Sequence, residues 1–445
     1  MKRNLYVGAA ILALAAGFGI GSAVLGRKAK VEAAGMTAPH FEVDPLWPKP
    51  LPNHWIIGQT IGLDVDKNDN VWIIHRPGTF DSSGKETYAM NTEGGHPWGD
   101  CCVAAPDVLE FNAAGDLIGH FARTDMQHDW PSSNHGITVD PTDGTIWLGG
   151  NGAGQNAPRP GAAAAPGAGR AAAPARGGRG ANPGAEEGVA TGQGAYHDSF
   201  ILHFTADGKW LGEIGGANMN KGSNDPNAPR GVAEIRFNKE GEMIAADGYG
   251  NKRVSIWDPK TLKIKRFWGA YGTKEIDDKN PGAYIPPTGD PAANADKQFR
   301  NPVHCAVPSN DGLIYVCDRV NDRLQVFKED GTYVKEIYME IYTRGDGSVW
   351  EIAFSKDPAQ KYMYIADGSN ERIHVFERES LKEIYAFGDG GRQPGQFYAV
   401  HSIATNSKGD IFTTETYRGQ RVQKFLYKGI KPVEKDYTGT SWPKK

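Results

Sequence analysis

One short unit recurs along most of the chain, and this repeat constrains the fold more than any other feature. The unit holds an apolar strand, a polar turn, a second strand ending in Asp-Gly or a similar pair, and two further strands. Its clearest copies are 242–258 (EMIAADGYGNKRVSIWD), 313–331 (LIYVCDRVNDRLQVFKEDG) and 362–379 (YMYIADGSNERIHVFERE). Repeats of about 40–50 residues built from short strands are typical of propeller blades, whereas a helical solenoid would need long stripes of 3.6-residue periodicity.

Six copies can be traced, and the sixth (411–425) lacks an obvious fourth strand. Residues 41–48 (FEVDPLWP), which precede the first copy, could supply that strand and leave no open sheet edge. The sequence therefore predicts an all-β, six-bladed β-propeller of four-stranded, NHL-type blades, closed by an N-terminal strand. One domain is expected over residues 41–430, followed by a C-terminal tail at 431–445.

Histidine occupies the start of the first strand in every second copy. The three are His135 in NHGITVD, His304 in NPVHCAV and His401 in YAVHSIA, while Ile61, Ala233 and Trp350 hold the same slot in the other copies. Alternate blades of a six-bladed ring would place three imidazoles about 120° apart around the axis, and zinc accepts such a set of nitrogens while keeping a fourth position open. The pattern predicts a site for zinc or a similar divalent ion.

The predicted metal site shares a face with the longest loops. In an up-and-down blade, the loop before the first strand and the loop between the second and third strands emerge on the same side. That side receives the insertions 78–106, 150–198 and 271–300, together with the second-strand ends that carry Arg76, Tyr249 and Arg319. Because loops on a rigid scaffold usually carry binding and catalysis, this face is the predicted active face.

The first 35 residues differ from the repeats. Basic residues flank an uncharged stretch over residues 4–26, which is long enough to span a bilayer, and the small residues near 31–35 (VEAAG) suit a signal peptidase. Residues 1–35 are therefore expected to be a signal peptide or an N-terminal membrane anchor. Either would export the propeller to a periplasmic or extracellular location, and an anchor would tether it to the membrane.

Composition narrows the expected partners. A net charge of −4 gives no basic footprint for nucleic acid, so nucleic acid is not an expected partner.

Residues 152–195 are rich in Ala, Gly and Pro, which predicts a disordered surface loop. Four cysteines are too few for a disulfide scaffold. Cys305 and Cys317 flank one predicted hairpin and Cys101 and Cys102 are adjacent, so the sequence leaves free thiols and a single bridge both open.

At these positions the chain resembles NHL-repeat propellers and, among them, peptidyl-α-hydroxyglycine α-amidating lyase, the lyase half of peptidylglycine α-amidating monooxygenase. HGITVD, DGYGNKR, the VH pair of blade four and VHSIA in blade six carry the resemblance, which covers most of residues 55–428. It implies zinc held by His135, His304 and His401, a base at Tyr249, and substrate-side arginines at Arg76 and Arg319. Family members split a peptidyl-α-hydroxyglycine into a peptide amide and glyoxylate.

Two residues depart from the family pattern. The family has an aspartate after the blade-six histidine that helps hold a structural calcium, and a methionine two residues before that histidine; Ser402 and Ala399 stand here. The expectation of calcium is weakened, and so is that of an identical substrate pocket. Glu234 and Glu351 follow the ring slot in blades three and five, where either cation binding or a hydrogen-bonded structural role would suit them.

The expected reaction cleaves the C–N bond of a carbinolamide. Zinc would acidify the substrate hydroxyl, Tyr249 would accept its proton, Arg76 would favour the tyrosinate, and Arg319 would hold the substrate carboxylate. The substrate is a small molecule or a peptide. No copper monooxygenase domain is evident in this sequence, so either a separate monooxygenase partner makes the hydroxyglycine or the substrate is another carbinolamide-like compound.

Two other functions stay open. Lactonase-type propeller hydrolases surround a central metal with carboxylate and amide oxygens, whereas the ring slots here offer histidine. A non-catalytic NHL binding module would present the loop face to a protein or an envelope polymer, and it would not need three symmetric histidines.

Overall fold

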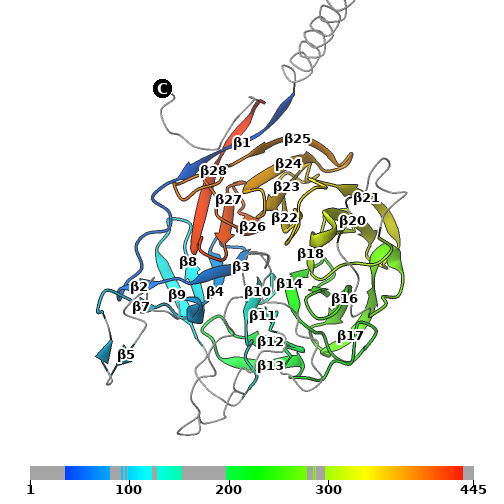
Figure 1. Ribbon diagram of the computed structural model, residues 1–445, viewed down its shortest axis with the longest axis horizontal. Helices are drawn as coiled ribbons and strands as arrows, with labels where there is room; N and C mark the ends of the chain where they lie inside the picture. The colour runs from blue at the N-terminus through cyan, green and yellow to red at the C-terminus, as the bar shows by residue number, and fades with distance from the viewer. Residues whose placement is uncertain are drawn as a thin grey trace, which may run out of the picture.

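A computed structural model describes residues 36–80, 92–93, 96–97, 99–122, 128–152, 197–277, 284, 286 and 296–433. Six four-stranded antiparallel sheets surround a central axis (Figure 1). Their innermost strands are β3 (Gln59–Val65), β10 (Asn134–Val139), β14 (Val232–Phe237), β18 (Val303–Pro308), β22 (Glu351–Phe354) and β26 (Val400–Thr405). Each innermost strand contacts the next, and β26 contacts β3. The ring is therefore closed, which confirms the predicted six-bladed propeller.

Within each blade the remaining strands follow outward from the axis. The second strands are β4 (Val71–Arg76), β11 (Ile146–Gly150), β15 (Met243–Asp247), β19 (Leu313–Asp318), β23 (Tyr362–Asp367) and β27 (Ile411–Glu415). The third strands are β8 (Val108–Phe111), β12 (Phe200–Phe204), β16 (Arg253–Asp258), β20 (Arg323–Lys328), β24 (Arg372–Glu377) and β28 (Arg421–Pro432). Blades one to five end in β9 (Leu117–Phe121), β13 (Trp210–Gly215), β17 (Lys263–Trp268), β21 (Tyr333–Tyr338) and β25 (Lys382–Phe387).

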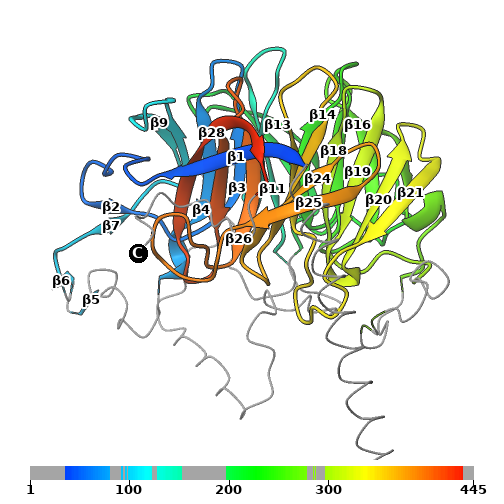
Figure 2. The same ribbon diagram turned by 90° about the horizontal axis from the view of Figure 1, so that it is seen from above.

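The N-terminal strand β1 (Thr37–Asp44) completes blade six. It pairs antiparallel with β28 and places Phe41 opposite Tyr427, which confirms the predicted closure (Figures 1 and 2). The strand begins earlier than the predicted segment, and β28 runs to Pro432, so two residues of the predicted C-terminal tail belong to the sheet. β1 thus covers the outer edge of β28 and joins an N-terminal segment to the last blade.

The hydrophobic core is divided among the blade interfaces. Six clusters of buried apolar side chains are present in the described residues, and each lies between two neighbouring blades. Fully buried examples are Ile137 between blades one and two and Val316 between blades three and four. Because alternate residues of a strand point to opposite faces, each blade packs on both neighbours and the axis is left to the first strands.

Ion pairs anchor the loops at the predicted active face. The acid that ends the second strand binds the arginine that starts the third, as in Asp247–Arg253 (2.7 Å) and Asp318–Arg323 (2.6 Å). Glu415 and Arg421 do the same in blade six. Blade five differs, because Arg372 is exposed and Asp367 instead lies 3.4 Å from His374. These pairs fix the short loops between the second and third strands, where Tyr249 and Arg319 lie.

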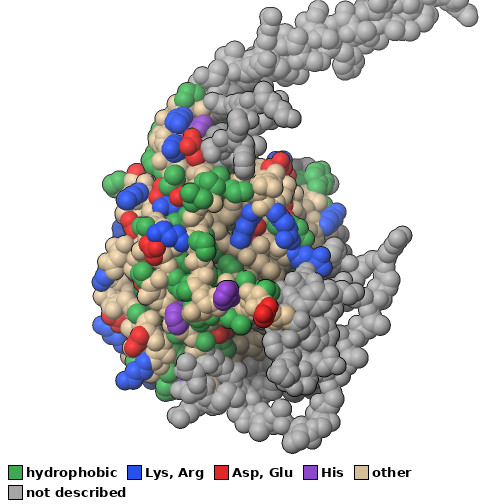
Figure 3. All heavy atoms as spheres, turned by 90° about the vertical axis from the view of Figure 1, so that its left-hand side faces the viewer, with side chains coloured by type: hydrophobic (Ala, Val, Ile, Leu, Met, Phe, Trp, Pro, Cys, Tyr) green, Lys and Arg blue, Asp and Glu red, His purple; other side chains and the backbone are tan. Residues whose placement is uncertain are grey.

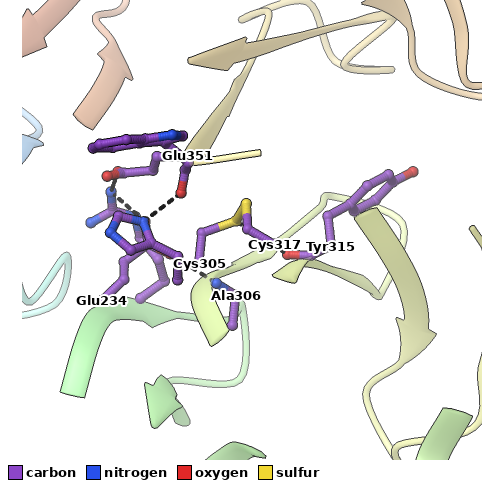
Figure 4. Close-up of a disulfide and its surroundings, with 9 residues drawn as sticks. Glu234, Cys305, Ala306, Tyr315, Cys317 and Glu351 are labelled. Carbon is purple, nitrogen blue, oxygen red and sulfur yellow. Dashed lines mark hydrogen bonds and ion pairs between the residues drawn. A yellow bond between two sulfur atoms is a disulfide. The ribbon is translucent and has the colours of Figure 1, made fainter. Parts of the chain in front are cut away.

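Both cysteine pairs form disulfides. Cys305 in β18 and Cys317 in β19 are direct cross-strand partners, with Cα atoms 4.8 Å apart (Figure 4). Cys101 and Cys102 are joined in the loop that precedes β7 (Val103–Ala104), a short strand that pairs parallel with β2 (Trp55–Ile56). The structure thus decides a question that the sequence left open.

Several sequence-based expectations concern other parts of the chain. Residues 1–35 and all but the first residue of the predicted loop 152–195 lie outside the described residues. Among those described, no helix has the length and apolar character needed to cross a membrane.

The side of the propeller in Figure 3 shows basic and acidic side chains interspersed with apolar ones.

Candidate metal centre and active face

The three predicted histidines meet on the propeller axis. His135 from β10, His304 from β18 and His401 from β26 are 1%, 1% and 0% exposed. Their ring centroids form a nearly equilateral triangle, with separations of 5.2, 4.8 and 4.7 Å. One potential ligand atom from each ring lies within 4.8 Å of the others, as expected from alternate blades of one ring.

Each imidazole is oriented by the next blade. Nδ1 of His135 lies 2.7 Å from the Ala233 carbonyl oxygen and Nδ1 of His304 lies 2.6 Å from that of Trp350. Nδ1 of His401 lies 3.0 Å from the Ile61 carbonyl. The residues that hold the ring slot in blades one, three and five therefore supply the acceptors for the histidines of blades two, four and six.

These contacts determine which nitrogen of each imidazole carries the proton. A carbonyl oxygen can only accept, so Nδ1 must carry the proton, and the neutral imidazole then presents an Nε2 lone pair. One nitrogen from each of the three buried rings lies within 4.8 Å of the other two, which suits a cation, and three imidazole nitrogens are a common zinc set that leaves one position open. The residues present thus fit the expected zinc or a similar divalent ion.

Glycine at position 136 lets the blades approach closely enough for this arrangement. A Cβ on Gly136 would lie 2.9 Å from the Ala233 carbonyl oxygen, the atom that accepts from His135. A larger side chain would therefore displace the acceptor that orients this imidazole.

Tyr249 lies directly beside the three histidines. Its hydroxyl is 3.0 Å from Nε2 of His135, to which it donates, and the side chain is 5% exposed. Arg319 donates from Nη1 to the same hydroxyl over 3.3 Å. The predicted base and one of the two predicted arginines are therefore brought together at the cluster.

Arg319 is almost fully enclosed. Its guanidinium carbon lies 4.6 Å from the Trp350 ring centroid and 5.8 Å from that of Tyr249. Nη2 is 3.7 Å from Oδ1 of Asp346, and Oδ2 of Asp346 accepts a 2.8 Å hydrogen bond from Tyr417. Stacking and ion pairing hold this cation in place against the phenol.

Arg76 occupies a different environment from the one expected. The sequence suggested that Arg76 would be the cation beside the phenol, but Arg319 holds that position. Arg76 instead donates to the Asn134 carbonyl, to Oε1 of Gln59 and to Oδ1 of Asn151, each over 3.0 Å. These three acceptors are neutral and use three of the five N–H groups of a guanidinium. They position Arg76 without offsetting its charge.

Sequence reasoning missed Asp346 and Tyr417. Tyr417 stands two residues after Glu415 and Tyr249 stands two residues after Asp247, so the two tyrosines share one position of the repeat. Aligning the second-strand ends could have identified Tyr417. Asp346 lies in the connection between β21 and β22, outside the strands, and no sequence signal marked it.

His75, which neighbours Arg76 in the sequence, forms hydrogen bonds to backbone groups of blade one. Its ring accepts from the Gly58 N–H and donates to the Pro106 carbonyl, and the side chain is fully buried. Burial lowers the pKa of this imidazole to about 4. His75 is thus held neutral between two loops of blade one.

Comparison with known proteins gives little beyond the architecture. No family model and no curated protein matches the chain. Among solved structures, a catalytically inactive variant of virginiamycin B lyase from Staphylococcus aureus with quinupristin is 12% identical, with a TM-score of 0.41 over 88% of this chain and 89% of that one. A streptogramin B lyase structure is also 12% identical, with a TM-score of 0.41 over 89% and 99%. At this similarity, the activities of those proteins are not transferred to this chain.

Proposed function

We propose that this protein is a zinc-dependent carbon–nitrogen lyase that cleaves a carbinolamide into an amide and glyoxylate, as peptidyl-α-hydroxyglycine α-amidating lyase does. The observation that carries the proposal is the Tyr249 hydroxyl, 3.0 Å from His135 at the three-histidine cluster and 3.3 Å from Arg319. A potential metal centre, a proton acceptor and a cation are combined in one buried site.

The chemistry requires a proton to leave the substrate hydroxyl as the C–N bond breaks. When bound to the three histidines, a divalent ion would act as a Lewis acid that makes such a hydroxyl more acidic. Tyr249, as the phenolate, accepts the hydroxyl proton, and the carbonyl of glyoxylate forms while the C–N electron pair moves to nitrogen. The phenol then returns this proton to nitrogen, so the amide leaves neutral and no oxidant or reductant is consumed.

The two arginines have separate roles in this proposal. Arg319 lies against the Tyr249 hydroxyl, where its positive charge favours the phenolate over the phenol. Arg76 is held by neutral acceptors with its charge not offset by them, so it suits the substrate carboxylate. These assignments exchange the roles that were expected from the sequence.

Export and partners complete the proposal. A signal peptide or anchor in residues 1–35 would deliver the propeller to a periplasmic or extracellular location. Such compartments are oxidising, so a disulfide such as Cys305–Cys317 can form and persist there. A separate monooxygenase would supply the hydroxylated substrate, a peptide or small molecule with a glycolate-like end.

Release of glyoxylate tests the function directly. Zinc-loaded protein is incubated with a synthetic peptidyl-α-hydroxyglycine, and glyoxylate and peptide amide are measured against buffer and against metal-free protein. We expect equal amounts of both products, formed faster than in either control. A metal-loaded protein that forms neither product would refute the proposed lyase and favour a binding module.

A further inference from the structure

Two buried glutamates lie directly beyond the histidine cluster along the first strands. Glu234 follows Ala233 in β14 and Glu351 follows Trp350 at the start of β22, and each is 4% exposed. Figure 4 shows both side chains beside the Cys305–Cys317 disulfide, with Ala306 next to Glu234. The sequence allowed these residues either a cation-binding or a structural role.

A single guanidinium joins the two carboxylates. Nη2 of Arg236, two residues after Glu234 in the same strand, lies 2.8 Å from Oε1 of Glu234 and 2.8 Å from Oε1 of Glu351. Arg236 also approaches blade one, with Nη1 3.9 Å from Asp64. The cluster therefore links blades three, five and one across the axis.

Glu234 extends the connection to blade four. Its second oxygen, Oε2, accepts a 2.9 Å hydrogen bond from the Ala306 backbone N–H, two residues after His304 in β18. Burial raises the pKa of both glutamates, and they remain beside a permanent cation rather than in water. Arg236 is the cation that contacts both carboxyl groups directly.

The glutamates are also covalently adjacent to the carbonyls that orient the metal centre. The carbonyl that accepts from His135 belongs to the Ala233–Glu234 peptide, and the one that accepts from His304 belongs to the Trp350–Glu351 peptide. Because a peptide group is planar, fixing the glutamate constrains the direction of the carbonyl before it. Arg236 holds both glutamates and therefore both peptide planes.

The third carbonyl, that of Ile61, is held by hydrogen bonds from two side-chain hydroxyls. The Ile61 oxygen, which accepts from His401, also receives hydrogen bonds from the hydroxyls of Ser402 (2.6 Å) and Thr414 (3.0 Å). All three acceptors are therefore supported by polar groups beyond the rings, two through one shared arginine and one through two hydroxyls.

We propose that Arg236, through its ion pairs with Glu234 and Glu351, is a positioning residue that sets the orientation of His135 and His304 and thereby the affinity of the centre for its metal. The inference rests on the metal site of the proposed function but not on the lyase reaction. Groups that hold the ligands of a metal typically change its affinity about 10–100-fold when they are removed.

The test compares Arg236→Met with Arg236→Lys. Methionine keeps most of the length and removes the charge, whereas lysine keeps a cation. Zinc dissociation constants are measured by competition with a chelator on folded protein. We expect zinc to bind about 10–100-fold more weakly to Arg236→Met, with most of the loss recovered in Arg236→Lys.

Arg266→Met is the matched control. Arg266 also binds a carboxylate, Glu242, through Nη1 and Nη2, and a backbone carbonyl through Nε, but it lies in the outermost strand of blade three. We expect its zinc affinity to stay within about 2-fold of the native value. Should Arg236→Met fail to fold, Glu351→Gln weakens the same ion pair at nearly constant volume and is expected to lower zinc affinity in the same direction.

A second measurement separates this inference from the proposed function. In metal-free protein, imidazole ¹⁵N shifts report which nitrogen is protonated, and His135 and His304 are expected to be Nδ1-protonated in the native protein but mixed in Arg236→Met. Ordered tautomers in the native protein that become mixed in Arg236→Met, with no zinc bound by either protein, would refute the metal centre and its affinity and leave only the orientation of His135 and His304 by Arg236. Unchanged tautomers and unchanged zinc affinity in Arg236→Met would refute the positioning role alone.

Discussion

Tyr249 and Tyr417 occupy the same position of the repeat in blades three and six, and both connect to Arg319. Tyr249 accepts directly from Nη1, while Tyr417 donates to Asp346, whose other oxygen lies 3.7 Å from Nη2. Blades three and six face each other across a six-bladed ring. The same repeat position thus places one tyrosine at the three-histidine cluster and another against Asp346, the acid that pairs with Arg319.

Replacing Tyr249 with phenylalanine should remove the proton acceptor while leaving the three histidines intact. Glyoxylate release is expected to fall by about 10²-fold or more, because general base catalysis typically contributes 10²–10⁴-fold. Zinc content, measured by mass spectrometry of the metal, should be unchanged. Tyr417→Phe is the matched control, because it removes an equivalent hydroxyl that touches Asp346 instead of His135; an equal loss in both variants would contradict the role of Tyr249.

Replacing Arg319 and replacing Arg76 should change different steady-state parameters. Arg319→Met removes the cation at the phenol and is expected mainly to lower kcat, since that contact matters when the proton moves. Arg76→Met removes the proposed carboxylate partner and should mainly raise KM, as expected when binding is lost equally from the ground and transition states. The reverse pattern would restore the roles expected from the sequence.

The fold was largely predictable because it depends on local periodicity repeated six times. The alternate histidines were also predictable, since ring symmetry converts equal repeat positions into neighbours on the axis. The tertiary contacts of residues in the loops were not predictable. Asn151, which holds Arg76, and Asp346, which pairs with Arg319, lie in loops whose course no pattern determines. The surroundings of the two arginines were therefore not predicted correctly.

The metal centre should depend on each histidine. We expect about one zinc ion per chain in the native protein, and almost none in His304→Ala, because two imidazoles bind zinc far more weakly than three. His120→Ala, which alters an exposed histidine in β9, is the control and should keep its metal. Full zinc occupancy in His304→Ala would contradict the three-histidine centre.

The Cys305–Cys317 disulfide should stabilise the hairpin that carries His304. It closes a loop with a sequence separation of 12 residues, for which chain-entropy arguments give about 2–3 kcal/mol of stabilisation. The double variant Cys305→Ala/Cys317→Ala should therefore unfold at lower denaturant concentration than the native protein. Reductant should affect native unfolding more than that of the variant, and equal midpoints for the two proteins would contradict a stabilising bridge.

His75 should make the propeller sensitive to mild acid. Its pKa is about 4 in the folded protein and 6.5 when unfolded, so between these values the unfolded chain binds a proton that the folded chain does not. Its contribution to stability is present above pH 6.5 and is lost as the pH falls toward 4, by about 3 kcal/mol in total. His75→Gln cannot titrate, so its unfolding free energy should fall less steeply over this range. Urea unfolding from pH 4 to 8 measures this difference, with the exposed His120→Gln as the control; parallel pH curves for native and His75→Gln proteins would show that the buried imidazole is not the group that responds.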